Sequence, residues 1–136
     1  MHNIRKINDD LSYIGCSERR LSLFESVYPV PDGVSYNSYF LDDDKTVLID
    51  TVDKACEIQF FENLKYVLQG RSLDYLIINH LEPDHSALIK TVIEKFKNVK
   101  IVCNQKIKQM LYQFFDFDFD IEPNFHVVKE GDILST

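Results

Sequence analysis

The chain has 136 residues, of which 45% are hydrophobic, so it can build one modest core but is too short for two ordinary domains. Twenty-two acidic residues against fifteen basic ones give a formal net charge of −7, which excludes the basic surface that nucleic-acid binders need. No run of about eighteen apolar residues predicts a membrane span, and acidic residues stand where a secretory signal is apolar. We therefore expect a cytoplasmic protein without nucleic-acid or membrane partners.

The first part of the chain favours short strands. Two are expected at 4–7 and 11–16. Two longer ones, at 34–41 and 46–51, are rich in aromatic and β-branched residues. The acidic segment 42–45 between them has the composition of a turn, so this region predicts a β-hairpin.

After the hairpin, helices alternate with short apolar strands. Residues 54–69 carry apolar side chains at helical spacing, and Gly70 follows where a helix would end. Further along we expect strands at 75–78, 99–103 and 125–128 and helices at 86–96 and 105–115. A last strand is expected to begin near Ile133. This order predicts an α/β fold, with a sheet covered by helices and the hairpin strands in the same or a facing sheet.

Four potential metal ligands follow the strand expected at 75–78. They comprise two imidazoles and two carboxylates: His80, Glu82, Asp84 and His85. The proline after Glu82 disfavours helical backbone there, which places the group on a strand-to-helix loop. Side chains two apart on extended backbone point the same way, so His80 and Glu82 can bind one ion. Asp84 and His85, at the turn into the next helix, can bind a second, and the spacing therefore predicts two metal ions.

The chemistry of this ligand set narrows the choice of metal. Imidazole and carboxylate suit iron, manganese or zinc, and the negative charge that Glu82 adds in place of an imidazole favours iron. The alternative is a solvated acidic loop that contains two histidines without binding metal.

The other polar motifs favour ordinary structural roles. Cys16, Cys56 and Cys103 are odd in number and have no C-x-x-C spacing, so we expect reduced thiols and no disulfide. His126 falls in an expected strand and is interpreted as a strand residue. Residues 116–120 imitate the start of a calcium loop but lack its glycine, so calcium binding is not expected.

The ligand loop and its surroundings resemble the flavodiiron proteins, or A-type flavoproteins, a branch of the metallo-β-lactamase superfamily. Zinc hydrolases of that superfamily carry H-x-H-x-D-H in this loop, whereas flavodiiron proteins carry H-x-E-x-D-H, and this chain has Glu82 at the deciding position. The resemblance covers nearly the whole chain, including residues 19–25, 33–39, 46–53 and 73–79.

The resemblance implies a fold and a ligand assignment. The fold is a metallo-β-lactamase-like αββα sandwich, of which residues 1–136 would form an incomplete, amino-terminal part without the flavodoxin-like FMN domain. His80 and Glu82 would ligate the first iron, and Asp84 and His85 the second. Asp50 would orient a ligand histidine, although an ordinary turn residue is the alternative. In full-length members a bridging Asp and two further His come from later in the chain.

The resemblance also implies a function. Flavodiiron proteins reduce dioxygen to water or nitric oxide to nitrous oxide, with electrons from FMN in a neighbouring subunit and from a rubredoxin-like donor. We therefore expect a diiron oxidoreductase chain that forms a homo-oligomer, in which FMN is bound only by the full-length protein. One alternative is a non-catalytic truncated fragment. Another, which Glu82 disfavours, is a zinc-dependent hydrolase whose loop would bind zinc.

Overall fold

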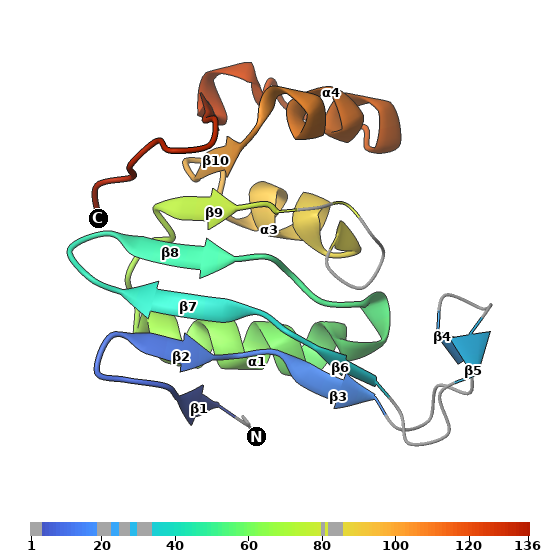
Figure 1. The fold of residues 1–136 in the computed structure, drawn as a ribbon, viewed down its shortest axis with the longest axis vertical. Helices are drawn as coiled ribbons and strands as arrows, with labels where there is room; N and C mark the ends of the chain where they lie inside the picture. The colour runs from blue at the N-terminus through green and yellow to red at the C-terminus, as the bar shows by residue number, and fades with distance from the viewer. Residues whose placement is uncertain (1–3, 19–22, 25–27, 30–33, 80, 82–85) are drawn as a thin grey trace.

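The structure is a computed structural model that describes residues 4–18, 23–24, 28–29, 34–79, 81 and 86–136 (Figure 1). Its described strands form one seven-stranded sheet and two sheets of two strands each. The strands are β1 (Arg5–Lys6), β2 (Leu11–Tyr13), β3 (Cys16–Glu18), β4 (Leu23–Phe24), β5 (Tyr28–Pro29), β6 (Val34–Tyr36), β7 (Tyr39–Asp42), β8 (Thr46–Ile49), β9 (Tyr75–Ile77), β10 (Lys100–Cys103) and β11 (Phe125–Val127). The helices are α1 (Glu57–Leu68), α3 (Ile89–Lys95) and α4 (Gln105–Phe114), with short 3₁₀ turns η1 (Lys54–Cys56) and η2 (Glu122–Asn124).

The large sheet is mixed, in the order β1-β2-β7-β8-β9-β10-β11. Strands β1, β2, β7 and β8 pair antiparallel, and the tight turn between β7 and β8 makes the expected hairpin. From β8 onward the pairs are parallel, because a helix carries the chain back between successive strands. The predicted α/β class is confirmed, with the hairpin strands in the same sheet as the parallel ones.

The expected strands at 11–16 and 34–41 are each divided in two. Gly15 is the reason, because a Cβ atom there would lie 1.9 Å from the Tyr36 carbonyl oxygen. This close approach lets β3 and β6 leave the large sheet and pair with each other. The Ile14 N–H donates to the Ser38 carbonyl at 2.9 Å. This hydrogen bond joins the β2–β3 and β6–β7 segments at the point where both pass from one sheet to the other.

The helix expected at 54–69 is confirmed as η1 followed by α1. The Asp53 carboxylate accepts a hydrogen bond of 2.9 Å from the Ala55 N–H and caps the first turn. At the other end Gln69 and Gly70 have positive φ of 49° and 84°, a left-handed termination that glycine favours. The side chains that α1 buries at i, i+4 and i+8 are Phe60, Leu64 and Leu68.

The remaining helices follow the sequence pattern with one shift. The helix expected at 105–115 is α4, whose N-cap Asn104 accepts a hydrogen bond of 2.8 Å from the Ile107 N–H. The helix expected at 86–96 is found as α3, which begins only at Ile89. None of the helices in the described ranges is long and apolar enough to cross a membrane.

The prediction that a strand begins near Ile133 is wrong. Ile133 is 91% exposed and lies in a segment without regular structure. Instead of pairing with a strand, this segment docks on the β7–β8 turn, where the Lys45 N–H donates to the Thr136 carbonyl at 2.7 Å.

The core lies between the large sheet and the helices. Figure 1 shows α1 and α3 behind the strands, and buried residues of α1, α3 and α4 belong to one cluster with Phe40, Leu48, Leu76 and Ile101 of the sheet. Side chains alternate along a strand, so the neighbouring positions point to the opposite face. That face presents partly exposed apolar residues, namely Leu11, Tyr13, Tyr39, Leu41, Ile49, Tyr75 and Ile77. The described structure is thus a helix layer and a sheet layer, with an apolar sheet face still open.

Candidate metal centre

The carboxyl ends of β8, β9, β10 and β11 meet at one edge of the large sheet because these strands are parallel. The chain leaves β8 at Asp50, β9 through Asn79 and β10 at Asn104. In open α/β sheets, ligands bind outside this edge. The segment 80–85 directly follows Asn79, so the strand that precedes it leads to the edge where a binding site is expected.

Asp50 fixes the residue that precedes this segment. Its Oδ1 accepts a hydrogen bond of 2.9 Å from the Asn79 N–H, and its Oδ2 accepts one of 2.9 Å from the Asn79 Nδ2. Asp50 itself is only 6% exposed. A buried carboxylate held this way rigidifies the start of the loop, because both oxygens accept from the same neighbour.

The backbone of Asp50 is held in an uncommon conformation. Its φ is 59°, in the left-handed region that Asp tolerates better than most residues. The Asp50 N–H donates to the Ile77 carbonyl at 2.9 Å, and the Ser38 hydroxyl donates to the Asp50 carbonyl at 2.8 Å. Ser38 is fully buried. Side-chain and backbone contacts from two neighbouring strands therefore stabilise this turn.

The four predicted ligands lie outside the described residues. His80, Glu82, Asp84 and His85 therefore stay predictions of the sequence, and their flanks are what the structure describes. On one side Ile78 is buried, and on the other the buried Ser86, Leu88 and Ile89 lead into α3. Leu81, inside the segment, packs against the core. The described residues on both sides of the segment thus include members of the core.

The remaining predictions about ligands have structural outcomes where the residues are described. His126 lies on β11 opposite Val102, which confirms it as a strand residue; His2 lies outside the described residues. In the segment 116–120, Phe117 and Phe119 pack against the core while the acids between them are exposed, which explains the alternation as burial of aromatic rings. Among the described residues, no three His, Cys, Asp or Glu side chains gather as a metal site.

Cys103 ends β10 near the same sheet edge. It is a free, buried cysteine, as expected. Burial raises the pKa of its thiol to about 11, and the positive charge of Lys108 only partly offsets that shift. At neutral pH the group is therefore a neutral thiol, which is a poor nucleophile and a poor metal ligand.

The other two cysteines contradict the expectation of reduced thiols. Cys16 and Cys56 form a disulfide between residues 40 positions apart, with their Cα atoms 6.5 Å from each other. The local spacing of the cysteines gave no sign of this bond, because β3 and η1 meet only when the chain folds.

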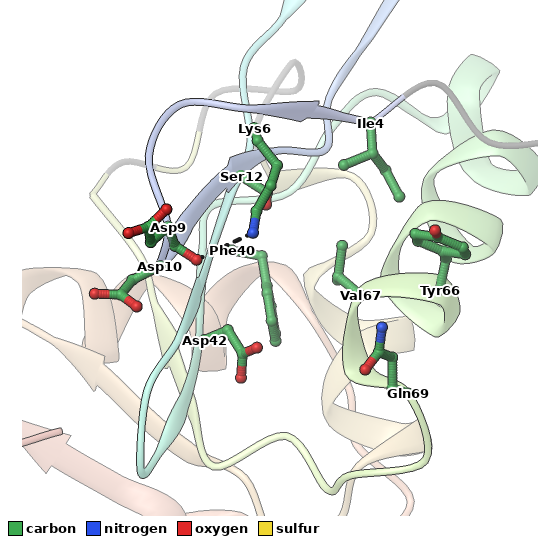
Figure 2. A pocket seen from close by; sticks show the side chains of 10 residues that line it. All are labelled: Ile4, Lys6, Asp9, Asp10, Ser12, Phe40, Asp42, Tyr66, Val67 and Gln69. Atoms are coloured by element: carbon green, nitrogen blue, oxygen red, sulfur yellow. Dashed lines mark hydrogen bonds between the residues drawn. The ribbon is translucent and has the colours of Figure 1, made fainter.

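A cavity of about 310 Å³ lies between the β1–β2 ribbon, β7 and the carboxyl end of α1 (Figure 2). Ser12 and Phe40, which pair across β2 and β7, are among its lining residues. Asp42 also lines it, and Asp42 pairs with Thr46 at the amino end of β8. The cavity is therefore at the sheet edge opposite Asn79 and is separate from the candidate metal centre.

The chain was compared with known protein families and curated proteins. The family model described as ODP family beta lactamase matches residues 34–134. Over 129 residues the chain is 34% identical to the anaerobic nitric oxide reductase flavorubredoxin of Aliivibrio fischeri, a match that covers 94% of this chain and 25% of that protein. The flavo-diiron protein FprA2 of Clostridium acetobutylicum is 35% identical over 99 residues, which are 73% of this chain and 25% of that protein.

The chain belongs to the flavodiiron family.

Solved structures agree with this assignment. Rubredoxin oxygen:oxidoreductase from Desulfovibrio gigas superposes on the flavodiiron chain with a TM-score of 0.85 at 30% identity, over 98% of this chain and 32% of that one. The flavodiiron protein from Giardia intestinalis gives a TM-score of 0.87 at 24% identity over 99% of this chain and 32% of that one, which supports the fold alone. The fold is thus the amino-terminal part of a metallo-β-lactamase-like domain, and the flavodiiron chain spans 25% of the first of these curated relatives.

Proposed function

We propose that this chain supplies His80, Glu82, Asp84 and His85 as ligands of a diiron centre in a reductase of dioxygen or nitric oxide. The observation that carries the proposal is the position of Asn79, the residue that directly precedes these ligands in the sequence. Asn79 follows β9 at the sheet edge where the parallel strands end, and its backbone N–H and side-chain amide donate to Asp50 at 2.9 Å. The names of similar proteins, a nitric oxide reductase and an oxygen oxidoreductase, support the reaction class.

The donor set of the loop fits iron. Two neutral imidazoles and two carboxylates add two negative charges, which favours hard cations over the softer ones that thiolates select. When bound, the iron pair supplies the redox chemistry. The residues of this chain would hold the two ions in position and contribute the negative charge of their carboxylates.

The proposal extends to the partners of the chain. The remaining ligands of the family centre, a bridging Asp and two His, would come from further polypeptide, and FMN would be bound by a domain other than this one. A rubredoxin-type protein is the proposed electron donor, in keeping with the names of the relatives. We further propose a cytoplasmic location and a homo-oligomer.

The position of Glu82 offers a direct test of iron against zinc. The purified chain and the Glu82→His variant, whose loop reads as in zinc hydrolases, are each loaded with equal iron and zinc under nitrogen. The proposal expects a higher ratio of bound iron to bound zinc in the wild type than in the variant. Equal zinc preference in both proteins would contradict it and favour the hydrolase alternative.

A non-catalytic role is the second candidate. The open apolar face of the large sheet favours association in either case, because such a surface is costly to leave in water. The two candidates differ in metal binding. A chain that associates without retaining iron or zinc would be a structural fragment.

A further inference from the structure

The Cys16–Cys56 disulfide ties two parts of the fold that have no other covalent connection nearby. Cys16 begins β3, and Cys56 ends η1, the turn that leads from β8 into α1. The cysteines are 4% and 7% exposed. The bond therefore closes a loop of 40 positions in the chain and passes close to the segment that follows Asp50.

A hollow at the surface gives access to one end of this bond. Cys56 is among the residues that line an open hollow of about 450 Å³ at the start of α1, whereas Cys16 is not in its lining. The charged side chains around the hollow include Lys54 and Glu57, which form an ion pair at 3.2 Å. A small thiol that enters this hollow from solvent would therefore approach the Cys56 end of the bond.

Both cysteines are also held by contacts that do not depend on the bond. Cys16 pairs with Tyr36 between β3 and β6, and the Cys56 N–H donates to the Asp53 carbonyl at 3.0 Å. Just before Cys16, the Ile14 carbonyl accepts a hydrogen bond of 3.1 Å from Asn63 Nδ2 of α1. Opening the disulfide would thus leave the two segments in place, which is what a reversible modification requires.

We propose that Cys16–Cys56 is a redox-responsive modification site, opened and closed by thiol–disulfide exchange at the Cys56 sulfur. A thiolate of an external dithiol attacks Cys56 Sγ, the Cys16–Cys56 bond breaks, and Cys16 leaves as a thiolate that takes up a proton. The second thiol of the dithiol then displaces Cys56, so the dithiol is oxidised to a disulfide and the protein gains two thiols. A small disulfide such as oxidised glutathione drives the reverse reaction.

The consequence concerns the segment beside the candidate metal centre. Residues 51–56 run from Asp50 to Cys56, so in the oxidised protein this segment is fixed at both ends. In the reduced protein the Cys56 side chain loses its covalent link to β3, while the hydrogen bonds between Asp50 and Asn79 stay. We expect faster amide exchange in 51–56 and a melting temperature lower by roughly 5–15 °C, because a closed loop of this size restricts the unfolded chain.

The test uses the purified chain with dithiothreitol or oxidised glutathione as the probe. After each treatment the protein is precipitated with acid and redissolved in denaturant at neutral pH, where its thiols are alkylated and then counted by intact mass. The oxidised form should carry one label, on Cys103, and the reduced form three. The expected melting shift should reverse on reoxidation. Three labels after oxidation, or reduction that unfolds the chain irreversibly by circular dichroism, would overturn the proposal.

Single-cysteine variants locate the attacked sulfur. In the Cys16→Ser variant, Cys56 should form a mixed disulfide with glutathione about tenfold faster than Cys16 does in the Cys56→Ser variant, because of the two cysteines only Cys56 is among the residues that line the hollow. Both variants also carry Cys103→Ser, so that one thiol reacts in each. Equal rates, or faster reaction at Cys16, would contradict attack at Cys56. Neither readout depends on bound metal, so the result is independent of the proposed function.

Discussion

The Asp50 carboxylate accepts hydrogen bonds of 2.9 Å from both the backbone N–H and the side-chain amide of Asn79. Asp50 ends β8 and Asn79 follows β9, so this pair links two parallel strands at the edge where the ligand segment begins. The pair keeps Asp50 in its left-handed conformation, with φ of 59°, and it fixes the backbone immediately before His80.

Replacing Asp50 by Asn should weaken metal binding. Asn tolerates the same backbone conformation, but it has a single acceptor oxygen and so cannot accept both hydrogen bonds from Asn79. We expect iron affinity to fall about 10- to 100-fold, as for other residues that position metal ligands. Affinity is measured by competition with a chelator. Asp53→Asn is the matched control, since Asp53 only caps η1; equal losses in both variants would argue against a specific role for Asp50.

A Gly15→Ala substitution should destabilise the fold. The added Cβ would lie 1.9 Å from the Tyr36 carbonyl oxygen, so the segments that contain Gly15 and Tyr36 must move apart. We expect a loss of about 3 kcal/mol in the free energy of unfolding, measured with urea. Gly70→Asn is the control, because that position has positive φ but no atom within 4 Å of the added Cβ. A loss in Gly15→Ala no larger than in the control would show that these two segments pack less closely than described.

Asn63 should stabilise the contact between α1 and the β2–β3 junction. It is fully buried, and its Nδ2 donates to the Ile14 carbonyl at 3.1 Å. Asn63→Leu leaves that carbonyl without this donor, so the expected loss is about 1–3 kcal/mol in the free energy of unfolding. Lys65→Ala, an exposed position of the same helix, should change stability by no more than about 0.5 kcal/mol. Comparable values for the two variants would contradict the role of Asn63.

A contact between α4 and η2 should make stability depend on pH. Hydrogen bonds from Lys108, at 2.5 Å, and Tyr112, at 2.6 Å, lower the pKa of Glu122 below its ordinary value of 4.5. A carboxyl with a lowered pKa stabilises the folded state above its ordinary pKa and loses this effect as the pH falls through the lowered one. Burial and the Glu122 contact raise the pKa of Tyr112 to about 12. The stability that Tyr112 contributes is therefore fully present below pH 10 and is lost as the pH rises to about 12.

Urea unfolding at pH 7 and pH 3 tests this contact. At pH 7 the wild type should be more stable than Glu122→Gln, and the difference should shrink as the pH falls below 4.5 toward pH 3. Glu130→Gln, an exposed glutamate after β11, serves as the control and should show no such convergence. A difference between wild type and Glu122→Gln that persists unchanged at pH 3 would mean that ionisation of Glu122 does not stabilise the contact.

Periodicity in the sequence was enough to place most elements of this fold. The hairpin of β7 and β8 and the helices α1 and α4 are local, so apolar spacing and turn residues specify them. The division of the strands at Gly15 was not visible, because it arises from contact with Tyr36, which is distant in sequence. The Cys16–Cys56 bond was missed for the same reason.

The same distinction between local and long-range information applies to the candidate site. Its four ligands could be proposed from the sequence because they fall within six residues after a strand. Asp50 could be singled out as a strand-end acid for which the family resemblance implies a role beside the ligand histidines. Its partner, Asn79, became visible only when the parallel pairing of β8 and β9 placed the two ends together.

The most direct test of the central claim is the iron content of the chain purified without oxygen. The wild type and the His126→Ala variant, which changes an exposed histidine on β11, are expected to retain equal amounts of iron. The His85→Ala variant should lose most of it, because it removes an imidazole from the proposed centre. Iron bound equally by all three proteins would contradict the assignment of His80, Glu82, Asp84 and His85 as its ligands.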